Sequence, residues 1–417
     1  MQDNFKKEIE KIYIIQPITR DNADKYRVLH EEAVSLIESA GAAYAGTLYQ
    51  NIREINAATY VGAGKLSELK NVLDGLDEIT ILFNGNLSPS QTLNISSALE
   101  DRKVIDRTTL ILDIFAKNAK SSEGKLQIEL AQLKYLYPRL KGKGAALSRL
   151  GGGVGTRGPG ETQLETDRRY IRGRLKYLEN RLRETEKRRS LQTARRKKEE
   201  IKTIALVGYT NTGKSTLLNV LTQAETYVKN ELFATLDPTA RKFRIEGIDF
   251  LLVDTVGFLQ ELPHNLIEAF KSTLESAINC DLALIVCDAT GEYDIQLQTT
   301  LQTLKEMNFD SPYLIVMNKS ENIRDQSAFP YGSVAISAKD NIGLDELKRQ
   351  ILHCFREEFV FCELFVPYEK TEEYVRLRKY LFERQIVYDE NGQKISATIP
   401  LRYADYFTAF IKKRISI

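Results

Sequence analysis

The run "TIALVGYTNTGKSTLLNVL", residues 203–221, constrains the fold more than any other part of the chain. It begins as an apolar strand, continues as Gly208-x-x-x-x-Gly213-Lys214-Ser215, and ends as an amphipathic helix. The two glycines let the backbone curl so that its N–H groups face a phosphate, and the helix N-terminus adds its positive dipole end. This strand–loop–helix order predicts a nucleoside-phosphate site in a parallel α/β domain.

A second apolar strand, "IDFLLVDTVGF", ends in Asp254-Thr255-Val256-Gly257. An aspartate at the carboxyl end of a strand beside a phosphate loop can hold Mg²⁺ through water, and the N–H of Gly257 can reach a γ-phosphate. Between the two motifs, "ELFATLDPTAR" offers a hydroxyl from Thr235 or Thr239 that would complete the magnesium shell. An ordinary polar loop is the alternative for that segment taken by itself.

Three further apolar runs, "LALIVCDA", "PYLIVMN" and "GSVAIS", follow at the spacing of βα units, so their polar ends share one edge of the sheet. The second ends in Asn318-Lys319-Ser320-Glu321, which resembles an Asn-Lys-x-Asp guanine-reading loop with a carboxylate one methylene too long. A carboxylate accepts from guanine N1–H and the 2-amino group, whereas adenine N1 is itself an acceptor. The loop predicts guanine recognition with a reduced margin over ATP.

Glycine-rich sequence separates two helical patterns in the middle of the chain. The segment "ALSRLGGGVGTRGPGETQLETDRR" has too many glycines for a helix or strand interior and is predicted to be a loop. The helical sequence on both sides predicts an αα-hairpin. Its second helix carries an excess of basic residues, among them Arg168, Arg169, Arg172, Arg174, Lys176, Arg181 and Arg183. An arm of this kind, with Arg157 in its tip, suits insertion among RNA phosphates; a solvated charged hairpin is the alternative.

The two ends of the chain are predicted to form smaller domains. Up to about residue 110, "KIYIIQPI", "AAYAGTLYQ" and "EITILFNG" alternate with helical patterns, which favours a small parallel α/β domain used as a scaffold or for docking. After residue 360 the pattern is strand, helix and a hairpin turned at Asn391-Gly392, and the tyrosines and arginines there either pack in a core or face RNA. The predicted domains are 1–112 (α/β), 113–199 (helical hairpin), 200–360 (nucleotide-binding) and 361–417 (α+β).

Composition limits the other possibilities. With 59 Lys and Arg against 57 Asp and Glu, the net charge is +2, so attraction to nucleic acid must come from local clusters. Cys280, Cys287, Cys354 and Cys362 lie in or beside apolar runs, without the spacing of a metal site, which predicts buried thiols in a reducing compartment. No run approaches the roughly 20 apolar residues that span a bilayer. We therefore expect a soluble, cytoplasmic protein without a membrane span, present as a monomer.

The order GxxxxGKS, FATLDPT, DTVGF, NKx and SAK, preceded by "GGGVGTRGPGETQLETDRR", resembles the HflX family of GTPases, in the Obg-HflX group of translation-factor relatives. The runs "ATYVGAGKLSEL", "VIDRTTLILDIFA" and "GKLQIELAQLKYLYPRL" extend the resemblance over the N-terminal region. It implies a GTPase that uses GTP/GDP and Mg²⁺, binds the large (50S) ribosomal subunit and its rRNA, and splits stalled or idle ribosomes under stress. Some members are associated with resistance to ribosome-targeting antibiotics.

The resemblance and the motifs together give the candidate site residues. Those expected to contact the nucleotide are Gly208, Tyr209, Thr210, Asn211, Thr212, Gly213, Lys214, Ser215 and Thr216, then Phe233, Ala234, Thr235, Leu236 and Asp237, then Asp254, Thr255, Val256 and Gly257, and at the base Asn318, Lys319, Glu321, Ser337, Ala338 and Lys339. Lys214, Thr235 and Gly257 are the candidate catalytic residues. Ser215, Thr235 and Asp254 are the candidate magnesium ligands.

Phe258 follows Gly257 where Ras-like enzymes keep a water-positioning glutamine. An apolar side chain cannot orient the attacking water, so two function classes stay open. One is a GTPase stimulated by a partner that arranges the water, which the resemblance identifies as the ribosome. The other is a stoichiometric RNA-binding factor gated by nucleotide, with relaxed GTP/ATP selectivity. His264, just downstream, is a less favoured candidate base.

Overall fold

The computed structural model describes residues 9–76, 78–148, 159–199, 201–223, 232, 239–260, 279–323 and 325–415. The chain divides into two compact units. Unit 1 comprises Met1–Leu191, Lys229–Asp237 and Leu259–Ser272, and unit 2 comprises Gln192–Val228, Pro238–Phe258 and Thr273–Ile417. Both units contain α/β structure, as the sequence predicts. Within the described residues, no helix is long and apolar enough to cross a membrane.

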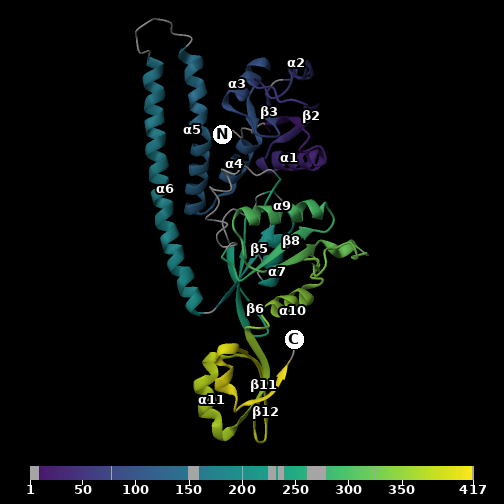
Figure 1. Ribbon diagram of the computed structural model, residues 1–417, viewed down its shortest axis with the longest axis vertical. Coiled ribbons are helices and arrows are strands. Elements are labelled where there is room, and N and C mark those ends of the chain that lie inside the picture. Colours follow the sequence, from purple (N-terminus) through teal and green to yellow (C-terminus); the bar gives the residue numbers. More distant parts are fainter. Residues whose placement is uncertain are drawn as a thin grey trace, which may run out of the picture. The chain divides into compact units, whose positions relative to one another are not determined.

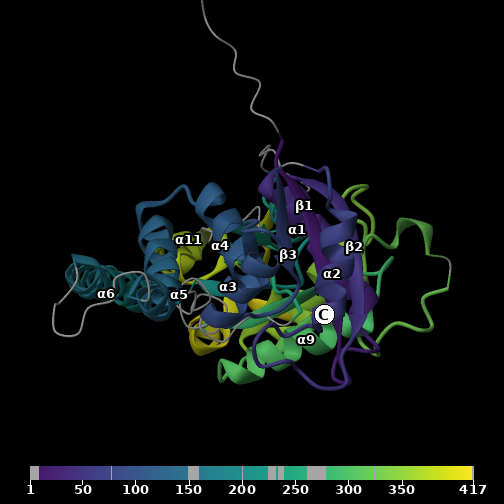
Figure 2. The same ribbon diagram turned by 90° about the horizontal axis from the view of Figure 1, so that it is seen from above.

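Unit 1 contains a parallel four-stranded sheet in the order β2-β1-β3-β4. Its strands are β1 (Lys11–Ile18), β2 (Ala43–Asn51), β3 (Ile79–Phe83) and β4 (Val104–Asp106), and its helices are α1 (Tyr26–Ala40), α2 (Ala63–Val72), α3 (Pro89–Ala98) and α4 (Arg107–Asn118). Figure 1 labels β2 and β3 of this sheet, and Figure 2 shows β1 beside both of them. The alternation of strands and helices is confirmed, although the short β4 was not predicted.

Local sequence signals set the ends of these helices. Gly41 ends α1 in the left-handed region with φ +84°, and its N–H donates to the Glu38 carbonyl. Ser88 and Gln91 form a capping box at the start of α3, where Pro89 occupies the first turn. The apolar faces of α2 and α3 then pack on one face of the sheet, in a core that includes Leu66, Leu69, Ile95, Ile15, Ile81 and Phe83.

Two long helices, α5 (Ser122–Ser148) and α6 (Pro159–Glu199), lie side by side as the predicted hairpin (Figure 1). Arg174 and Glu129 join them, with 2.6 Å between Nε and Oε1. The predicted loop was too long, because both helices extend into it and only residues 149–158, with Arg157, lie outside the described chain. Pro159 suits the first position of a helix, and the glutamates, glutamine and leucine that follow it favour helix.

Unit 2 contains a six-stranded sheet in the order β10-β9-β8-β5-β7-β6, in which only β6 runs antiparallel to its neighbour. Its strands are β5 (Lys202–Gly208), β6 (Thr239–Ile245), β7 (Ile248–Asp254), β8 (Leu282–Asp288), β9 (Tyr313–Asn318) and β10 (Val334–Ala335), and its helices include α7 (Lys214–Leu221), α9 (Tyr293–Glu306) and α10 (Leu344–Cys354). Because the central strands are parallel, the carboxyl ends of β5, β7, β8 and β9 share one edge, as predicted.

The C-terminal part of unit 2 is an antiparallel sheet in the order β12-β13-β11-β14. Its elements are β11 (Phe359–Pro367), α11 (Thr371–Leu377), β12 (Phe382–Asp389), β13 (Gly392–Pro400) and β14 (Ile411–Ile415). A hairpin joins β12 and β13 as predicted, but its turn is Glu390-Asn391, one residue before the predicted Asn391-Gly392, because Gly392 pairs with Asp389 in the sheet. Strand β14 was not predicted. Phe359 and Phe361 of β11 belong to the same core cluster as Phe250 and Phe355. The start of β11 therefore packs in the core of the six-stranded sheet.

Three of the four cysteines are buried, but Cys354 is exposed, so the prediction of a buried thiol is wrong at that position. Cys354 ends α10, whose buried stripe runs through Leu344, Leu347, Ile351 and Leu352. Burial raises the pKa of the Cys287 thiol to about 12, so this side chain stays protonated and unreactive at neutral pH.

Candidate nucleotide-binding site

The phosphate loop leaves β5 at Gly208 and enters α7 at Lys214. Gly208 has φ +143°, and a Cβ there would lie 2.3 Å from the Val286 carbonyl oxygen of the neighbouring strand. Gly213 has φ +91°, and a Cβ there would lie 2.2 Å from Asn318 Nδ2. Side chains are therefore excluded at both positions by backbone conformation and by contact, which is why the motif requires glycine there.

Lys214 is buried against the loop that precedes it. Its Nζ donates to the carbonyl oxygens of Gly208 at 3.1 Å and Tyr209 at 2.5 Å. Burial lowers the pKa of Lys214 to about 8, and the nearby Asp254 carboxylate partly opposes this shift. The ammonium group thus lies inside the curl of the loop, where a phosphate chain would meet it, and it is charged at neutral pH.

Ser215 and Asp254, predicted to share a cation, are brought together by the structure. Ser215 Oγ, on the first turn of α7, donates to Asp254 Oδ2 at the end of β7 over 2.6 Å. A hydroxyl and a carboxylate oxygen at this spacing fit the hard oxygen ligands that Mg²⁺ prefers. No cluster of three or more His, Cys, Asp and Glu side chains suited to a metal occurs in the part of the chain described. Beside Ser215, Asp254 and the predicted ligand Thr235, a cation here would take its remaining ligands from phosphate and water.

The Asp254–Gly257 loop is bonded directly to the phosphate loop. Thr210 N–H donates to the Phe258 carbonyl at 2.8 Å, and Phe258 N–H donates to the Gly208 carbonyl at 3.0 Å. A Cβ on Gly257 would lie 2.8 Å from Thr210 Cα and 2.9 Å from Lys214 Nζ. The two loops can approach this closely only because Gly257 has no side chain.

Asn318 links the predicted base loop to both neighbouring segments. Its Nδ2 donates to the Thr212 carbonyl at 2.8 Å, and its Oδ1 accepts from the Ala338 N–H at 2.9 Å. The side chain is 2% exposed. One buried amide thus fixes the phosphate loop against the Ser337-Ala338-Lys339 segment, so the candidates from three distant stretches of sequence are assembled at one edge of the sheet.

Asp288 is a site residue that sequence analysis missed. It is the last residue of β8, it lies opposite Asn318 in the sheet register, and its Oδ2 is 2.6 Å from Lys319 Nζ. Lys319 itself has φ +64°, a conformation that is uncommon for a residue with a side chain. The sequence contained a signal for Asp288, because this acidic residue ends the apolar run "LALIVCD" and so lies at the ligand-binding edge of the sheet.

The remaining base-loop residues lie in short turns. Glu321 is exposed in a 3₁₀ turn, Ser320–Asn322, and its carboxylate has no hydrogen bond or ion pair within the described chain. Ser337 Oγ accepts from the Asp340 N–H at 3.2 Å, and Lys339 is exposed. Glu321 is therefore free to turn toward a base, whereas Ser337 shapes the turn that carries Ala338.

Several candidates cannot be placed. Phe233, Ala234, Thr235, Leu236 and Asp237 lie outside the described residues, as does His264. The assignment of Thr235 as a magnesium ligand and catalytic residue stays a prediction. Phe258 is described, and it is 1% exposed with its side chain in the core, so it cannot touch a water near Gly257.

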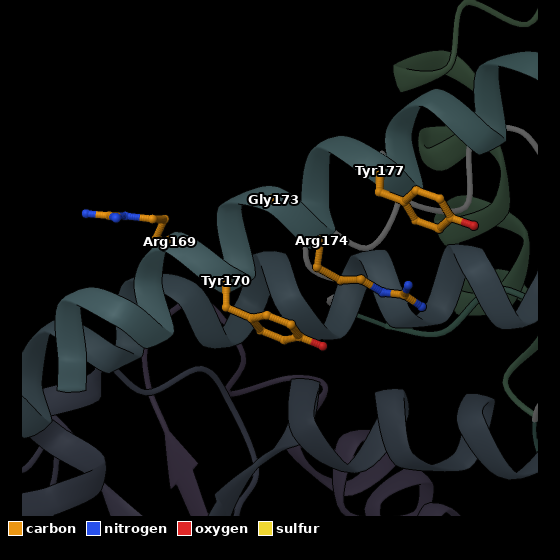
Figure 3. A pocket seen from close by; sticks show the side chains of 5 residues that line it. All are labelled: Arg169, Tyr170, Gly173, Arg174 and Tyr177. Carbon is orange, nitrogen blue, oxygen red and sulfur yellow. The ribbon is translucent and has the colours of Figure 1, made fainter.

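The helical arm carries a second surface feature, a hollow lined by arginines and tyrosines. Arg169, Tyr170, Gly173, Arg174 and Tyr177 line a shallow hollow of about 530 Å³ on α6, and three of these side chains, Tyr170, Arg174 and Tyr177, project to one side (Figure 3). Glu129 holds both Nε and Nη2 of Arg174, so part of the predicted basic surface is internally neutralised. Arg169, Lys176 and Arg183 are exposed and form no ion pair with a described carboxylate.

Comparisons with known proteins bear on all of these regions. Three family models match the chain: "GTP-binding GTPase N-terminal" over residues 28–116, "GTP-binding GTPase Middle Region" over 118–196, and "50S ribosome-binding GTPase" over 203–319. The GTPase HflX of Caldanaerobacter subterraneus is 48% identical over 388 residues, which cover 91% of this chain and 89% of that protein. This chain belongs to the HflX family. The HflX of Lacrimispora saccharolytica is 41% identical over 403 residues, which cover 94% and 95% of the two chains.

Membership of the HflX family identifies the activity. The chain is a GTPase, which binds GTP and GDP and hydrolyses GTP. A solved structure of a GTP-binding protein from the archaeon Sulfolobus solfataricus in complex with GDP is also similar, at 25% identity over 84% of this chain and 99% of that one, with a TM-score of 0.44. Because the chain belongs to the HflX family, the assembled edge of the six-stranded sheet is its candidate GTP site.

Proposed function

We propose that this HflX-family GTPase docks on the large ribosomal subunit, contacts its rRNA, and splits or rescues stalled or idle ribosomes under stress. The observation that carries the proposal is the presence, in one chain, of a phosphate loop bonded to its γ-phosphate sensor and of a long helical arm with exposed basic residues. Protection against ribosome-targeting antibiotics is a further role that the family resemblance implies. In this division of labour, residues 200–360 hold the nucleotide, 113–199 reach rRNA, and 1–112 and 361–417 serve docking.

We infer the residue roles in the pocket from the geometry of the described residues and, for Thr235, from the family resemblance. The N–H groups between Gly208 and Ser215 would cradle the phosphates, and Lys214 would neutralise their β and γ oxygens. Ser215 and Asp254, with Thr235, would hold Mg²⁺, which adds positive charge at the phosphate oxygens when it is bound. The N–H of Gly257 would report the γ-phosphate. Asn318, Ala338 and Glu321 would meet the base.

The position of Phe258 argues for a partner in hydrolysis. Its side chain is buried, and its main chain is fixed to the phosphate loop by two hydrogen bonds. No side chain at this position is available to orient the attacking water, so intrinsic turnover should be slow. We propose that binding to the large subunit arranges the catalytic water and stimulates hydrolysis.

Multiple-turnover hydrolysis of GTP and ATP, with and without large subunits, tests this proposal. We expect stimulation by the subunit and a steep loss of subunit binding as salt increases, because phosphate contacts release counterions. Removing residues 151–160 should abolish splitting and leave intrinsic hydrolysis near wild type. The triple variant Arg169→Ala/Lys176→Ala/Arg183→Ala should weaken subunit binding and reduce its salt dependence.

A charge-matched control separates the effect of losing basic residues on the arm from the effect of lowering the net charge of the protein. The variant Lys242→Ala/Lys305→Ala/Arg356→Ala removes three exposed basic side chains from residues 200–360, outside the regions proposed to contact the subunit, and should leave subunit binding nearly unchanged. If the tip deletion loses basal hydrolysis but still splits ribosomes, the proposed division of labour is wrong. If the subunit binds but never stimulates turnover, the alternative of a stoichiometric, nucleotide-gated RNA-binding factor is favoured instead.

Glu321 is expected to read guanine imperfectly. Glu321→Asp should shorten the carboxylate to the usual reach and tighten GTP by up to ~1–2 kcal/mol, with ATP almost unchanged, since adenine offers no donor pair. Glu321→Ala should weaken GTP selectively, and xanthine nucleotides should bind wild type worse than guanine nucleotides do. Nucleotide titrations measure this, with Glu292→Ala as a control at an exposed carboxylate. Flat GTP affinity in Glu321→Asp, with equal changes for GTP and ATP in Glu321→Ala, would mean that this side chain does not read the base.

A further inference from the structure

A cluster of tyrosines lies on the C-terminal sheet domain, beyond residue 319 where the matched family models end. Tyr380 closes a 3₁₀ turn, Arg378–Tyr380, and Tyr403 and Tyr406 lie on another, Leu401–Phe407. The ring centroids are 4.7 Å apart for Tyr380 and Tyr403, 5.7 Å for Tyr380 and Tyr406, and 5.9 Å for Tyr403 and Tyr406. Two turns that are distant in sequence thus build one aromatic surface, here called the tyrosine cluster.

The tyrosine cluster sits above the core rather than inside it. Tyr380 and Tyr403 are partly buried and pack on the core of this domain, while Tyr406 is 55% exposed. The three hydroxyls have no hydrogen-bond partner in the described chain, whereas Tyr368 donates to the Asp389 carbonyl and Tyr374 to the Glu383 carboxylate. The domain therefore supplies partners to the hydroxyls of Tyr368 and Tyr374 and leaves the three cluster hydroxyls to solvent or a ligand.

Positive charge borders the same surface. Lys379 Nζ lies 4.7 Å from the centroid of the Tyr380 ring, and Arg402 Cζ lies 4.4 Å from the centroid of the Tyr403 ring. Lys379 forms no ion pair with a described carboxylate. Flat π faces next to cations match the two components of single-stranded RNA, whose bases stack on aromatic rings and whose phosphates attract cations. An acidic peptide would use the cations but would leave the tyrosine rings without a planar partner.

We propose that the tyrosine cluster is a stacking platform for unpaired RNA nucleotides, with Lys379 and Arg402 placed to meet the flanking phosphates. A base stacks on Tyr406, the most exposed of the three rings. Tyr380 and Tyr403 contact the Tyr406 ring and fix its position. The proposal rests on the proposed ribosomal partner only for the source of the RNA, because the chemistry of the platform does not depend on the nucleotide site or on the arm.

Photo-crosslinking of the full-length protein to a 12-nucleotide RNA containing 4-thiouridine tests the platform. Because the arm is also expected to bind RNA, the measured quantity is the RNA concentration that gives half-maximal crosslinking at Tyr380 and Tyr403, mapped by mass spectrometry. Tyr406→Ala should raise this concentration at least about fivefold. Tyr406→Phe should keep it within about twofold, because stacking needs the ring and not the hydroxyl. Tyr388→Ala, at a 69% exposed tyrosine on β12, is the matched control and should have no effect.

The outcomes separate this inference from the proposed function. GTP hydrolysis and melting temperature should be unchanged in Tyr406→Ala, which shows that the variant is folded. Absence of crosslinks at the cluster, or equal loss in Tyr406→Ala and Tyr388→Ala, would overturn the platform. If the wild-type protein crosslinks to the oligonucleotide at the cluster but does not bind the large subunit, the platform is upheld and the proposed function is refuted.

Discussion

Replacing Lys214 with alanine is expected to lower kcat/KM for GTP by on the order of 10³-fold. The ammonium group lies inside the phosphate loop, 3.1 Å from the Gly208 carbonyl oxygen, and would contact β and γ oxygens in both the ground state and the transition state. Nucleotide binding should therefore weaken together with hydrolysis. Titration with a fluorescent GDP analogue and steady-state hydrolysis, with and without large subunits, measure the two effects.

The control for Lys214→Ala is Lys242→Ala, which removes an exposed lysine from β6 and should leave both quantities unchanged. Thermal unfolding checks that the variants are folded, since Lys214 also holds two loop carbonyls. Wild-type turnover in a folded Lys214→Ala protein would place the phosphates elsewhere and would reject the site.

The variant Gly257→Ala, which adds one methyl group, should also lower GTP hydrolysis. The Cβ of Gly257→Ala would lie 2.8 Å from Thr210 Cα, which is backbone and cannot move aside cheaply. The two loops would have to separate, and the pair of hydrogen bonds between Phe258 and the phosphate loop would be lost. We expect kcat to fall by on the order of 10²-fold and stability to fall by about 1–3 kcal/mol, the usual cost of overpacking.

Gly64→Ala is the matched control for this second variant. Gly64 lies inside α2, and a Cβ there would meet nothing within 4 Å. Alanine should be neutral or stabilise the helix by up to ~1 kcal/mol, without changing hydrolysis. The hydrolysis rate and the melting temperature should therefore both fall in Gly257→Ala, and neither should fall in Gly64→Ala. Normal turnover by Gly257→Ala would show that the two loops need not touch during the reaction.

Elements whose pattern spans several residues were predicted well. The alternation of apolar strands with helices gave the parallel sheets, because a buried parallel strand must be apolar on both faces. A hairpin was expected here because Asn-Gly is typical of tight turns, although the turn lies one residue earlier, at Glu390-Asn391, and Gly392 begins β13. The three-residue β4 and the final strand β14 were missed, because a short or polar strand shows too little alternation of apolar and polar residues to be recognised.

The arm shows where composition misled. The glycines after residue 150 predicted a loop running to residue 169, yet α6 begins at Pro159. Helix propensity in the following residues outweighed the neighbouring glycines, and packing against α5 through pairs such as Arg174 and Glu129 stabilises the helix. The same packing engages part of the basic surface, which no count of arginines could have predicted.

The sequence by itself determined the chemistry of the nucleotide site, because the phosphate loop and its glycines are local and depend only on backbone angles and on the first turn of a helix. Tertiary structure alone decided which distant groups meet: Asp288 with Lys319, Asn318 between Thr212 and Ala338, and Phe258 turned into the core. These contacts join residues up to 106 positions apart, between Thr212 and Asn318. Spacing along a chain does not encode them, because strand order and register bring such residues together only once the sheet has formed.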